Sequence, residues 1–380
     1  MFEIAIMLLP VAAASGWYVA ARHYKGKANK PLNEHEGYFK GLNYLLNEQP
    51  DKAIDVFIDL LEVDDETIEV HLALGTLFRQ RGEVEKAIRL HQNLIARPKI
   101  NNITRTALLN ELGLDYMRAG LLDRAENIFL EIEKSNSHKV NATRQLLSVY
   151  QQEKEWLKAI EYAEKLESIE SYKQTPLLSH LHCEAALFYK DDSDVSITRN
   201  HLRKALKIDP ICVRANLINA EMAITAQGYK QALKFLMKIM DQDVRFVPVF
   251  IDMILTCFDE LDKPKQKFDF LANLQLVNES TIVISRFMDV LLNQRGAAEA
   301  SAFMHKKLLE HPSKSYLMLY AQVDDAEPAN AEAVFLRNII KQLGDEASGF
   351  QCKQCGFTSV DLNWCCPSCK EWGVTEPVLV

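Results

Sequence analysis

The chain has 380 residues, which exceeds the size at which a single core usually stops growing, so several domains or an open repeat array are expected. Glycine and proline are sparse, at 14 and 12, and leucine, alanine, lysine and glutamate dominate the middle, which predicts an all-α body. The formal charge of −8 offers no field that would hold a nucleic-acid backbone, which argues against nucleic acid as the partner.

The N-terminal residues 1–21 are predicted to form a transmembrane anchor. Phe2–Ala21 contains Glu3 as its only charge and, as a helix, is long enough to cross roughly 30 Å of hydrocarbon. A basic linker, 22–33, follows, so the positive-inside bias predicts a single pass with the N-terminus in the periplasm and the remainder in the cytoplasm. A cleaved signal is disfavoured because an acid precedes the apolar core, and a buried soluble helix because Pro10 and the missing polar face suit a membrane better.

Residues 34–345 are predicted to form tetratricopeptide-type helical repeats, because the sequence resembles itself at a period near 34. Two antiparallel helices meet closely only where one side chain is nearly absent, and an aromatic side chain one turn later fills the adjoining gap. A small residue recurs at Ala53, Ala87, Ala125, Ala159, Thr198, Ala232 and Ala300. Twelve residues upstream the chain has Gly41, Gly75 and Gly113, followed by Tyr44, Phe78 and Tyr116.

Further features divide this array into seven to nine units. Pro210 and Pro312 are predicted to end repeats, because proline stops a helix. Additional residues around Pro98–Thr104 and Ser171–Pro176 indicate loop insertions between units. The next buried layer is predicted four residues past the small position, at Phe57, Phe129, Leu202 and Leu236.

Repeat superhelices of this kind generally bind peptides or proteins on the concave surface made by the first helix of each unit. Each outward polar residue there is also compatible with simple solvation, so the hypothesis concerns the groove as a whole. The candidate groove residues are Thr76, Arg79, Asn110, Arg118, Arg144 and Gln151.

Residues 346–380 are predicted to form a small metal ribbon. Two C-x2-C knuckles separated by ten residues are typical of a structural metal site, with Cys352, Cys355, Cys366 and Cys369 as ligands. Cys365 would give C-x3-C spacing and is predicted to be a non-ligand thiol. Four thiolates suit one iron or one zinc ion, and both alternatives stay open.

The ribbon is too short to bury enough apolar surface alone, so metal binding is expected to supply its folding energy. Gly356 is predicted to allow positive φ in the first knuckle. Phe350, Phe357, Trp364 and Trp372 are expected to pack around the metal as an apolar shell.

Catalytic patterns are missing from the sequence, which predicts a protein that is not an enzyme. The chain has no phosphate-binding G-x4-G-K-[ST] loop, no G-x-S-x-G elbow and no H-E-x-x-H. A thioredoxin-like redox role for the knuckles lacks the βαβ context it needs. On a helix His180 would share a face with Cys183 and Glu184 but not with His182, so these are predicted to be packing residues instead of a metal site.

The whole layout resembles the lipopolysaccharide assembly protein B family, essentially end to end. The resemblance rests on Leu8–Ala14 with Gly16-Trp17-Tyr18, on the repeat stretch Leu77–Val84, and on the rubredoxin-like tail Cys352–Trp372. It implies an inner-membrane adaptor that brings the lipid A pathway deacetylase to a membrane-anchored ATP-dependent metalloprotease and so limits lipopolysaccharide synthesis. Other inner-membrane lipopolysaccharide regulators are implied as further partners. The same four cysteines are implied as metal ligands, with histidine expected in relatives at the place of Cys365.

Three hypotheses follow. The first is an adaptor that promotes proteolysis of its client enzyme. The second is a scaffold that assembles lipopolysaccharide synthesis or export enzymes without affecting their turnover. The third is a redox enzyme or sensor that uses the metal ribbon, which would require a reversible change in metal or thiol state.

Overall fold

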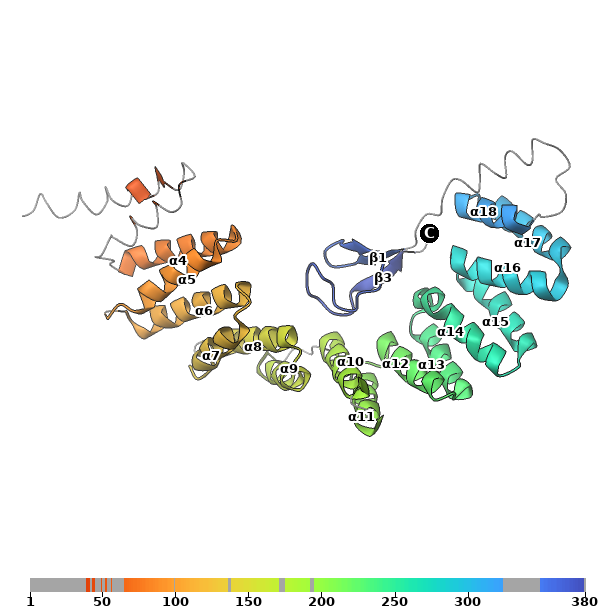
Figure 1. Ribbon diagram of the computed structural model, residues 1–380, viewed down its shortest axis with the longest axis horizontal. Coiled ribbons are helices and arrows are strands. Elements are labelled where there is room, and N and C mark those ends of the chain that lie inside the picture. The colour runs from red at the N-terminus through yellow and green to blue at the C-terminus, as the bar shows by residue number, and fades with distance from the viewer. Residues whose placement is uncertain are drawn as a thin grey trace, which may run out of the picture. The chain divides into compact units, whose positions relative to one another are not determined.

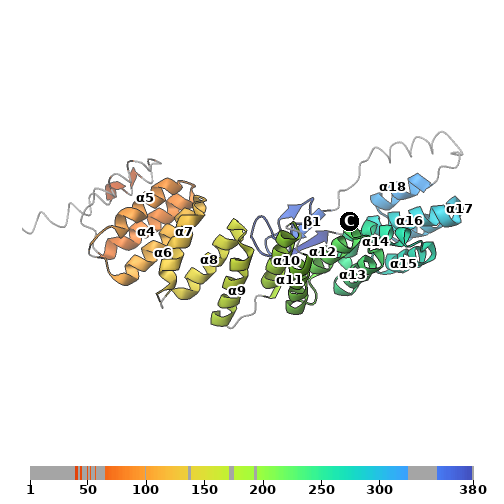
Figure 2. The same ribbon diagram turned by 60° about the horizontal axis from the view of Figure 1, so that its bottom comes forward.

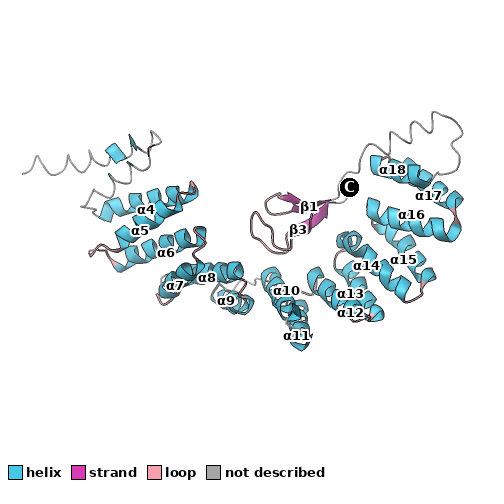
Figure 3. Ribbon diagram, in the orientation of Figure 1, coloured by secondary structure: helices cyan, strands magenta, loops and turns pink. Residues whose placement is uncertain are grey.

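The computed structural model describes residues 65–98, 100–135, 138–170, 175–191, 195–323 and 349–378, with a few positions between 39 and 56. The chain divides into two compact units, Met1–Lys154 and Glu155–Val380. Helices fill both units, and a small β-ribbon belongs to the second (Figures 1 and 3). The predicted anchor 1–21 and linker 22–33 lie outside the described residues. Within the described residues, no helix combines the length and the apolar character that crossing a bilayer requires.

The first unit is a row of helices in which each packs on the next (Figure 2). Its described helices are α4 (Asp65–Gln80), α5 (Val84–Ile95), α6 (Asn102–Arg118), α7 (Leu122–Glu133) and α8 (Lys139–Glu153). The insertion predicted around Pro98–Thr104 corresponds to the connection from α5 to α6, and α6 begins within it, at Asn102. Asn101 caps α6 by accepting a hydrogen bond from the backbone N–H of Thr104 at 2.8 Å.

The predicted close approach of helices is confirmed at two glycines of this unit. A Cβ atom on Gly75 would lie 2.3 Å from Nε2 of His91, and one on Gly113 would lie 2.6 Å from the ring of Phe129. Ala87 and Ala125, the small residues of the second helices, are fully buried. Helix α4 therefore meets α5, and α6 meets α7, at the points that the periodicity indicates.

The second unit continues the same pattern. Its helical elements are α9 (Trp156–Glu170), α10 (Thr175–Asp191), α11 (Val195–Ile208), α12 (Val213–Thr225), α13 (Tyr229–Gln242), the 3-10 helix η1 (Val244–Phe246), α14 (Val247–Glu260), α15 (Pro264–Val277), α16 (Thr281–Arg295), α17 (Ala297–Glu310) and α18 (Lys314–Val323). Pro210 and Pro312 lie in the turns after α11 and α17, as predicted. The predicted small residues are fully buried here too, at Ala159, Thr198, Ala232 and Ala300. Ala53 and Phe57 lie outside the described residues.

A three-stranded antiparallel sheet of order β2-β1-β3 forms the ribbon. Its strands are β1 (Gly349–Cys352), β2 (Thr358–Ser359) and β3 (Thr375–Val378). Strand β3 also contacts η1, so the ribbon lies against the repeats of its own unit near α10, α12 and α14 (Figures 1 and 2). The predicted helical repeats with a small C-terminal ribbon are thus confirmed.

Candidate metal centre and repeat surfaces

The two cysteine knuckles have matching backbone geometry. In the first, the N–H of Gly356 donates to the carbonyl of Cys352 at 2.9 Å; in the second, the N–H of Lys370 donates to the carbonyl of Cys366 at 2.9 Å. Gly356 has φ 77°, as predicted, and Lys370 adopts φ 63° at the corresponding position. Each knuckle is a tight turn that presents its two sulfur atoms from one side.

Four thiols converge between these turns. The sulfur atoms of Cys352, Cys355, Cys366 and Cys369 lie within 4.8 Å of one another, with 3.7 Å from Cys352 to Cys369 and from Cys355 to Cys366. A disulfide would need about 2.05 Å. A tetrahedron with metal–sulfur bonds of about 2.3 Å has edges of about 3.8 Å. The spacing therefore fits one tetrahedral ion, and these cysteines are the residues that could hold it.

The electrostatics of the thiols also favour a cation. The backbone N–H of Phe357 is the main cause that lowers the pKa of Cys355 to about 6. The backbone N–H of Glu371 acts in the same sense on Cys369, but burial and the three neighbouring thiols outweigh it and raise that pKa to about 12. Four adjacent thiolates repel one another, so a bound ion is required before all of them ionise.

Cys365 lies outside the group of converging thiols. Its sulfur donates to the carbonyl of Lys370 at 3.4 Å, and its backbone forms a bridge with Trp372. Burial is the main cause that raises the pKa of the Cys365 thiol. This placement agrees with the prediction of a thiol that is not a ligand.

The aromatic face of the ribbon is seated on the repeats. The ring of Trp372 stacks on His180 of α10 with centroids 5.7 Å apart, and Trp364 stacks on Phe246 of η1 at 5.8 Å. The guanidinium of Arg214, from α12, lies 5.9 Å from the Trp364 ring and 5.8 Å from the Trp372 ring. We call His180, Arg214, Phe246, Trp364 and Trp372 the ribbon seat.

The aromatic residues that were predicted to pack around the metal differ in their surroundings. Trp364 and Trp372 lie against the repeats, and Phe357 is 38% exposed. The reason is that the repeats offer a cation and an imidazole against which the indole rings can be buried, whereas the short ribbon has no interior large enough for them.

The seat contains a buried arginine that is paired with a carboxylate, and a buried histidine. Arg214 is 7% exposed and forms an ion pair of 2.7 Å with Glu184 of α10. Burial, followed by the positive charge of Arg214, lowers the pKa of His180 to about 3, so the buried imidazole is neutral at physiological pH. Nδ1 of His180 and one guanidinium nitrogen of Arg214 are buried without a hydrogen-bond partner among the described residues. The seat therefore depends on close packing.

An ion-pair cluster lies next to the seat, where η1 contacts β3. Arg245 of η1 donates to Glu376 of β3 at 2.7 Å and to Asp243 at 2.7 Å. Lys353 of the first knuckle pairs with the same Glu376. The hydrogen bonds to Asp243 and then Glu376 raise the pKa of Arg245. A half-exposed cluster of this kind adds orientation more than stability.

The seat contains residues that the sequence did not identify as functional. His180 was predicted to be a packing residue, and it is buried, but its partner is the ribbon. Arg214 and Phe246 of the seat, and Arg245 beside it, carried no sequence signal. His182 points to a different neighbour, His201, with 3.0 Å between their Nδ1 atoms, which confirms that it does not share a site with His180.

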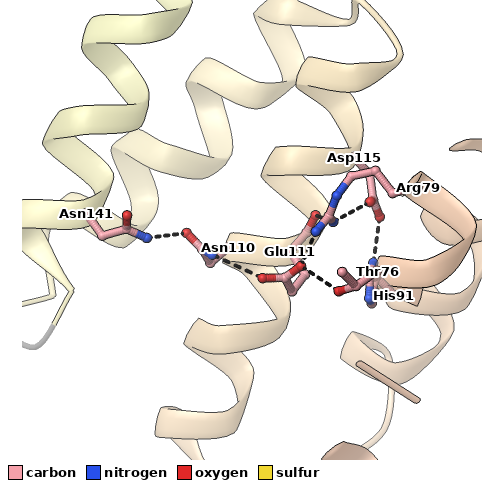
Figure 4. A network of polar contacts seen from close by, with 7 residues as sticks. All are labelled: Thr76, Arg79, His91, Asn110, Glu111, Asp115 and Asn141. Carbon is pink, nitrogen blue, oxygen red and sulfur yellow. Dashed lines mark hydrogen bonds and ion pairs between the residues drawn. The ribbon is translucent and has the colours of Figure 1, made fainter. Parts of the chain in front are cut away.

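The predicted groove residues Thr76, Arg79 and Asn110 belong to one polar network of the first unit (Figure 4). Arg79 donates to Glu111 at 2.6 Å and to Asp115 at 2.8 Å. The network, here named the repeat network, consists of Thr76, Arg79, His91, Asn110, Glu111, Asp115 and Asn141.

Asp115 is the centre of this network. Its carboxylate is fully buried and also accepts from Nδ1 of His91 at 2.5 Å. Burial alone would lower the pKa of Arg79, but its hydrogen bonds to Glu111 and Asp115 outweigh burial and raise it. Asn141 of α8 donates to Asn110 at 2.8 Å, which extends the network to a fourth helix. Thr76, Arg79 and Asn110 thus join neighbouring helices.

The other groove candidates lie on α6 and α8. Arg118 lines a hollow of about 510 Å³ together with Arg79, Leu114, Met117 and Gln152. Arg144 and Gln151 lie on α8, and neither is among the residues that line it. The structure brings Arg79 and Arg118 to one surface, and peptide binding there remains a prediction.

Comparison with known proteins places these parts in a family. The family described as "Rubredoxin metal binding domain" matches residues 350–376, and a tetratricopeptide repeat family matches 70–102. A tetratricopeptide repeat protein from Parabacteroides merdae is a solved structure with 15% identity and a TM-score of 0.35, covering 68% of this chain and 99% of that one.

Full-length relatives give a stronger match. "Lipopolysaccharide assembly protein B" of Escherichia coli (strain K12) is 33% identical over 385 residues, covering 100% of this chain and 98% of the relative. The protein of the same name from Haemophilus influenzae is 33% identical over 392 residues, with the same coverage. The chain therefore belongs to the lipopolysaccharide assembly protein B family.

Proposed function

We propose that this chain is a non-catalytic adaptor in the control of lipopolysaccharide assembly. In this role it brings the lipid A pathway deacetylase to a membrane-anchored ATP-dependent metalloprotease and promotes its degradation, alongside other inner-membrane lipopolysaccharide regulators. The anchor 1–21 holds the chain at the inner membrane by a single pass, with the repeats and the ribbon in the cytoplasm. Tethering raises the effective concentration of the repeats toward partners in the same membrane.

One observation argues against a substrate-binding catalytic metal. Four thiols at tetrahedral spacing fill every position around one ion, which leaves no open position for a substrate. The names of the full-length relatives support the connection with lipopolysaccharide.

The metal has a structural role in this proposal. One iron or zinc ion, when bound, supplies folding energy to the ribbon, and the ribbon then presents Trp364 and Trp372 to the repeats. The effect of the metal on the repeats is therefore indirect, because the ribbon must fold around the metal before the ribbon seat can form. Arg214 and His180 hold the ribbon in place, and the repeat surfaces remain available to protein partners.

The half-life of the deacetylase tests the proposal. It would be followed by immunoblot after translation is stopped, in Gram-negative cells that carry this chain as their only copy. Removal of the chain, or the double substitution Cys366→Ser and Cys369→Ser, should lengthen the half-life several-fold. Cys365→Ser is the matched control and should leave it near the wild-type value, because this thiol lies outside the converging group.

The level of the variant chain has to be measured in the same samples. If the cysteine variant accumulates normally and the deacetylase is stabilised, the metal ribbon is needed for the adaptor role. If removal of the whole chain leaves the half-life unchanged while lipopolysaccharide output changes, the adaptor proposal fails and the scaffold alternative replaces it.

A further inference from the structure

A second hollow lies in the first unit, where α5 ends and α6 begins. It has a volume of about 610 Å³, and its lining includes Arg97, Pro98, Ile100 and Arg105. The loop insertion that the repeat period indicated, around Pro98–Thr104, forms part of its wall. We call it the α5–α6 hollow. Its residues take no part in the repeat network or in the ribbon seat.

The surroundings of this hollow are strongly basic. From Lys86 to Asn110 the chain has five lysine and arginine residues and no aspartate or glutamate, although the whole chain carries −8. Two of these cations, Arg97 and Arg105, line the hollow, and none of its described lining residues carries a carboxylate. The local charge is therefore opposite in sign to that of the chain as a whole.

Neither guanidinium is neutralised within the described part of the chain. Arg105 makes one long hydrogen bond, 3.4 Å, to the carbonyl of Ile95, and the side chain of Arg97 makes none to another described residue. Arg79, on the preceding helix α4, forms ion pairs with two carboxylates. Burial lowers the pKa of Arg97 with no opposing contact, whereas carboxylate contacts raise that of Arg79. An anion bound at the hollow would give Arg97 the negatively charged hydrogen-bond partner that Arg79 already has.

The rest of the lining is largely apolar. Ile95, Pro98, Ile100 and Leu112 line the hollow together with the two cations, and Gln92 and Asn102 add neutral amides. A small hydrated anion would leave these apolar side chains without a contact. A chain that alternates carboxylate and apolar side chains would satisfy both kinds of surface, because guanidinium groups bind carboxylates by paired hydrogen bonds.

We propose that the α5–α6 hollow binds an extended segment of a partner protein that carries carboxylate side chains next to apolar ones. The inference rests on the proposed adaptor function, since it assigns a protein partner to the repeats. Arg97 and Arg105 take the carboxylates, and Pro98, Ile100 and Leu112 take the apolar side chains. Recognition at this hollow is by charge and shape, independent of the metal ribbon.

A purely structural role for the two arginines makes a different prediction. Cations near the C-terminal end of α5 interact favourably with the helix dipole. If that were their whole role, replacing them would lower the thermal stability of the first unit and would not change the binding of any peptide.

Fluorescence anisotropy of the purified full-length chain in detergent micelles separates these roles. The probe is a fluorescein-labelled peptide of three glutamate-leucine pairs, compared with a glutamine-leucine peptide of equal length. The Arg97→Gln and Arg105→Gln double variant should bind the acidic probe about tenfold or more weakly, since charge-assisted hydrogen bonds are lost at both cations. Arg89→Gln, which removes an exposed charge of α5 outside the hollow, should bind like the wild type.

Several outcomes would overturn the proposal. These are equal binding of both peptides, equal binding by the double variant, or displacement of the probe by inorganic phosphate at constant ionic strength. Displacement by phosphatidylglycerol but not phosphatidylcholine in the micelles, lost in the double variant, would assign the hollow to a lipid headgroup and equally overturn it. The half-life test of the adaptor role uses the ribbon cysteines, so failure of peptide binding leaves that result standing.

Discussion

The repeat network of the first unit and the ribbon seat of the second both contain a partly or fully buried arginine, but they connect different parts of the chain. Arg79 is held by Glu111 and Asp115, 32 and 36 residues away, so it joins one repeat to the next. Arg214 contacts the rings of Trp364 and Trp372, which are 150 and 158 residues further along the chain. One arrangement stabilises the repeats themselves, and the other attaches a separate small domain to them.

This difference has a thermodynamic consequence. A repeat array is stabilised by contacts between neighbours, so loss of the repeat network should weaken the helices that form it. Loss of the ribbon seat should release the ribbon while the helices below it stay folded. In an adaptor, the second kind of contact is the one that a metal, a proton or a partner could change without unfolding the protein.

The largest effect is expected from Asp115→Ala in the first unit. The substitution leaves His91 and Arg79 without their shared buried carboxylate, and removing one partner of a buried ion pair costs about 3–5 kcal/mol. Hydrogen exchange of the full-length chain, measured by mass spectrometry, should be faster by more than about a hundredfold across α4 to α7. Exchange in the ribbon should not change.

Asp123→Ala is the matched control for this substitution. Asp123 is an exposed acid in the first turn of α7, so its removal should cost less than about 1 kcal/mol. Equal effects of the two substitutions, or faster exchange in the ribbon as well, would contradict the view that the network acts only between neighbouring repeats.

The next effect in size concerns the seat, and Gly373→Ala tests it. Gly373 has φ 68°, and a Cβ atom there would lie 2.8 Å from Nε2 of His180. The left-handed backbone costs about 1–2 kcal/mol for alanine, and the contact with His180 adds to it. The urea concentration at which the ribbon leaves the repeats, followed by tryptophan emission, should fall by an amount equivalent to about 2–3 kcal/mol.

Gly356→Ala provides a comparison at a second glycine of the same ribbon. Its φ is 77°, and no atom of the described residues lies within 4 Å of the added Cβ. In this variant the backbone cost falls within the metal knuckle, in the attached and in the released ribbon alike, so it should weaken ribbon attachment less than Gly373→Ala. If both variants behave alike, the contact with His180 contributes nothing to attachment. Thiolate-to-metal absorbance should persist in both if the effect lies in the seat.

The repeats could be predicted from the sequence because their contacts are periodic. Ala87, Ala125 and Ala232 recur at intervals set by a helix-turn-helix unit, and each is fully buried. The two knuckles were predictable for a related reason. A C-x2-C spacing is a local requirement of the turn, and Cys352 and Cys366 begin turns with the same hydrogen bonds.

The ribbon seat could not be predicted in the same way. His180 and Arg214 lie on helices whose repeat pattern is satisfied without them, and no periodicity links them to Trp372. Asp115 was missed because the sequence alone gives no sign that it is buried. An acid in a predicted first helix suggests a solvated residue, and its burial depends on His91 and Arg79 arriving from neighbouring helices. The structure supplies these long-range pairings.

The smallest effect is a dependence of ribbon attachment on pH. The buried His180 has a pKa of about 3, against about 6.5 for a solvated imidazole. When the ribbon is released, His180 binds a proton below pH 6.5, whereas in the seat it does not until about pH 3. Attachment is therefore strongest above pH 6.5 and weakens as the pH falls. Between pH 8 and pH 5 the loss should be on the order of 2 kcal/mol.

His180→Gln isolates this proton from the others in the chain. Urea titrations followed by tryptophan emission give the free energy of ribbon attachment at pH 8 and at pH 5. The change between the two pH values is then compared between wild type and variant. Thiolate-to-metal absorbance confirms that the ion stays bound at both values. A variant that keeps the wild-type pH dependence would show that another group, such as a ligand thiol, controls attachment. A variant that loses it would show that the neutral His180 beside Arg214 makes the ribbon seat sensitive to acid, a property that the repeat network does not require.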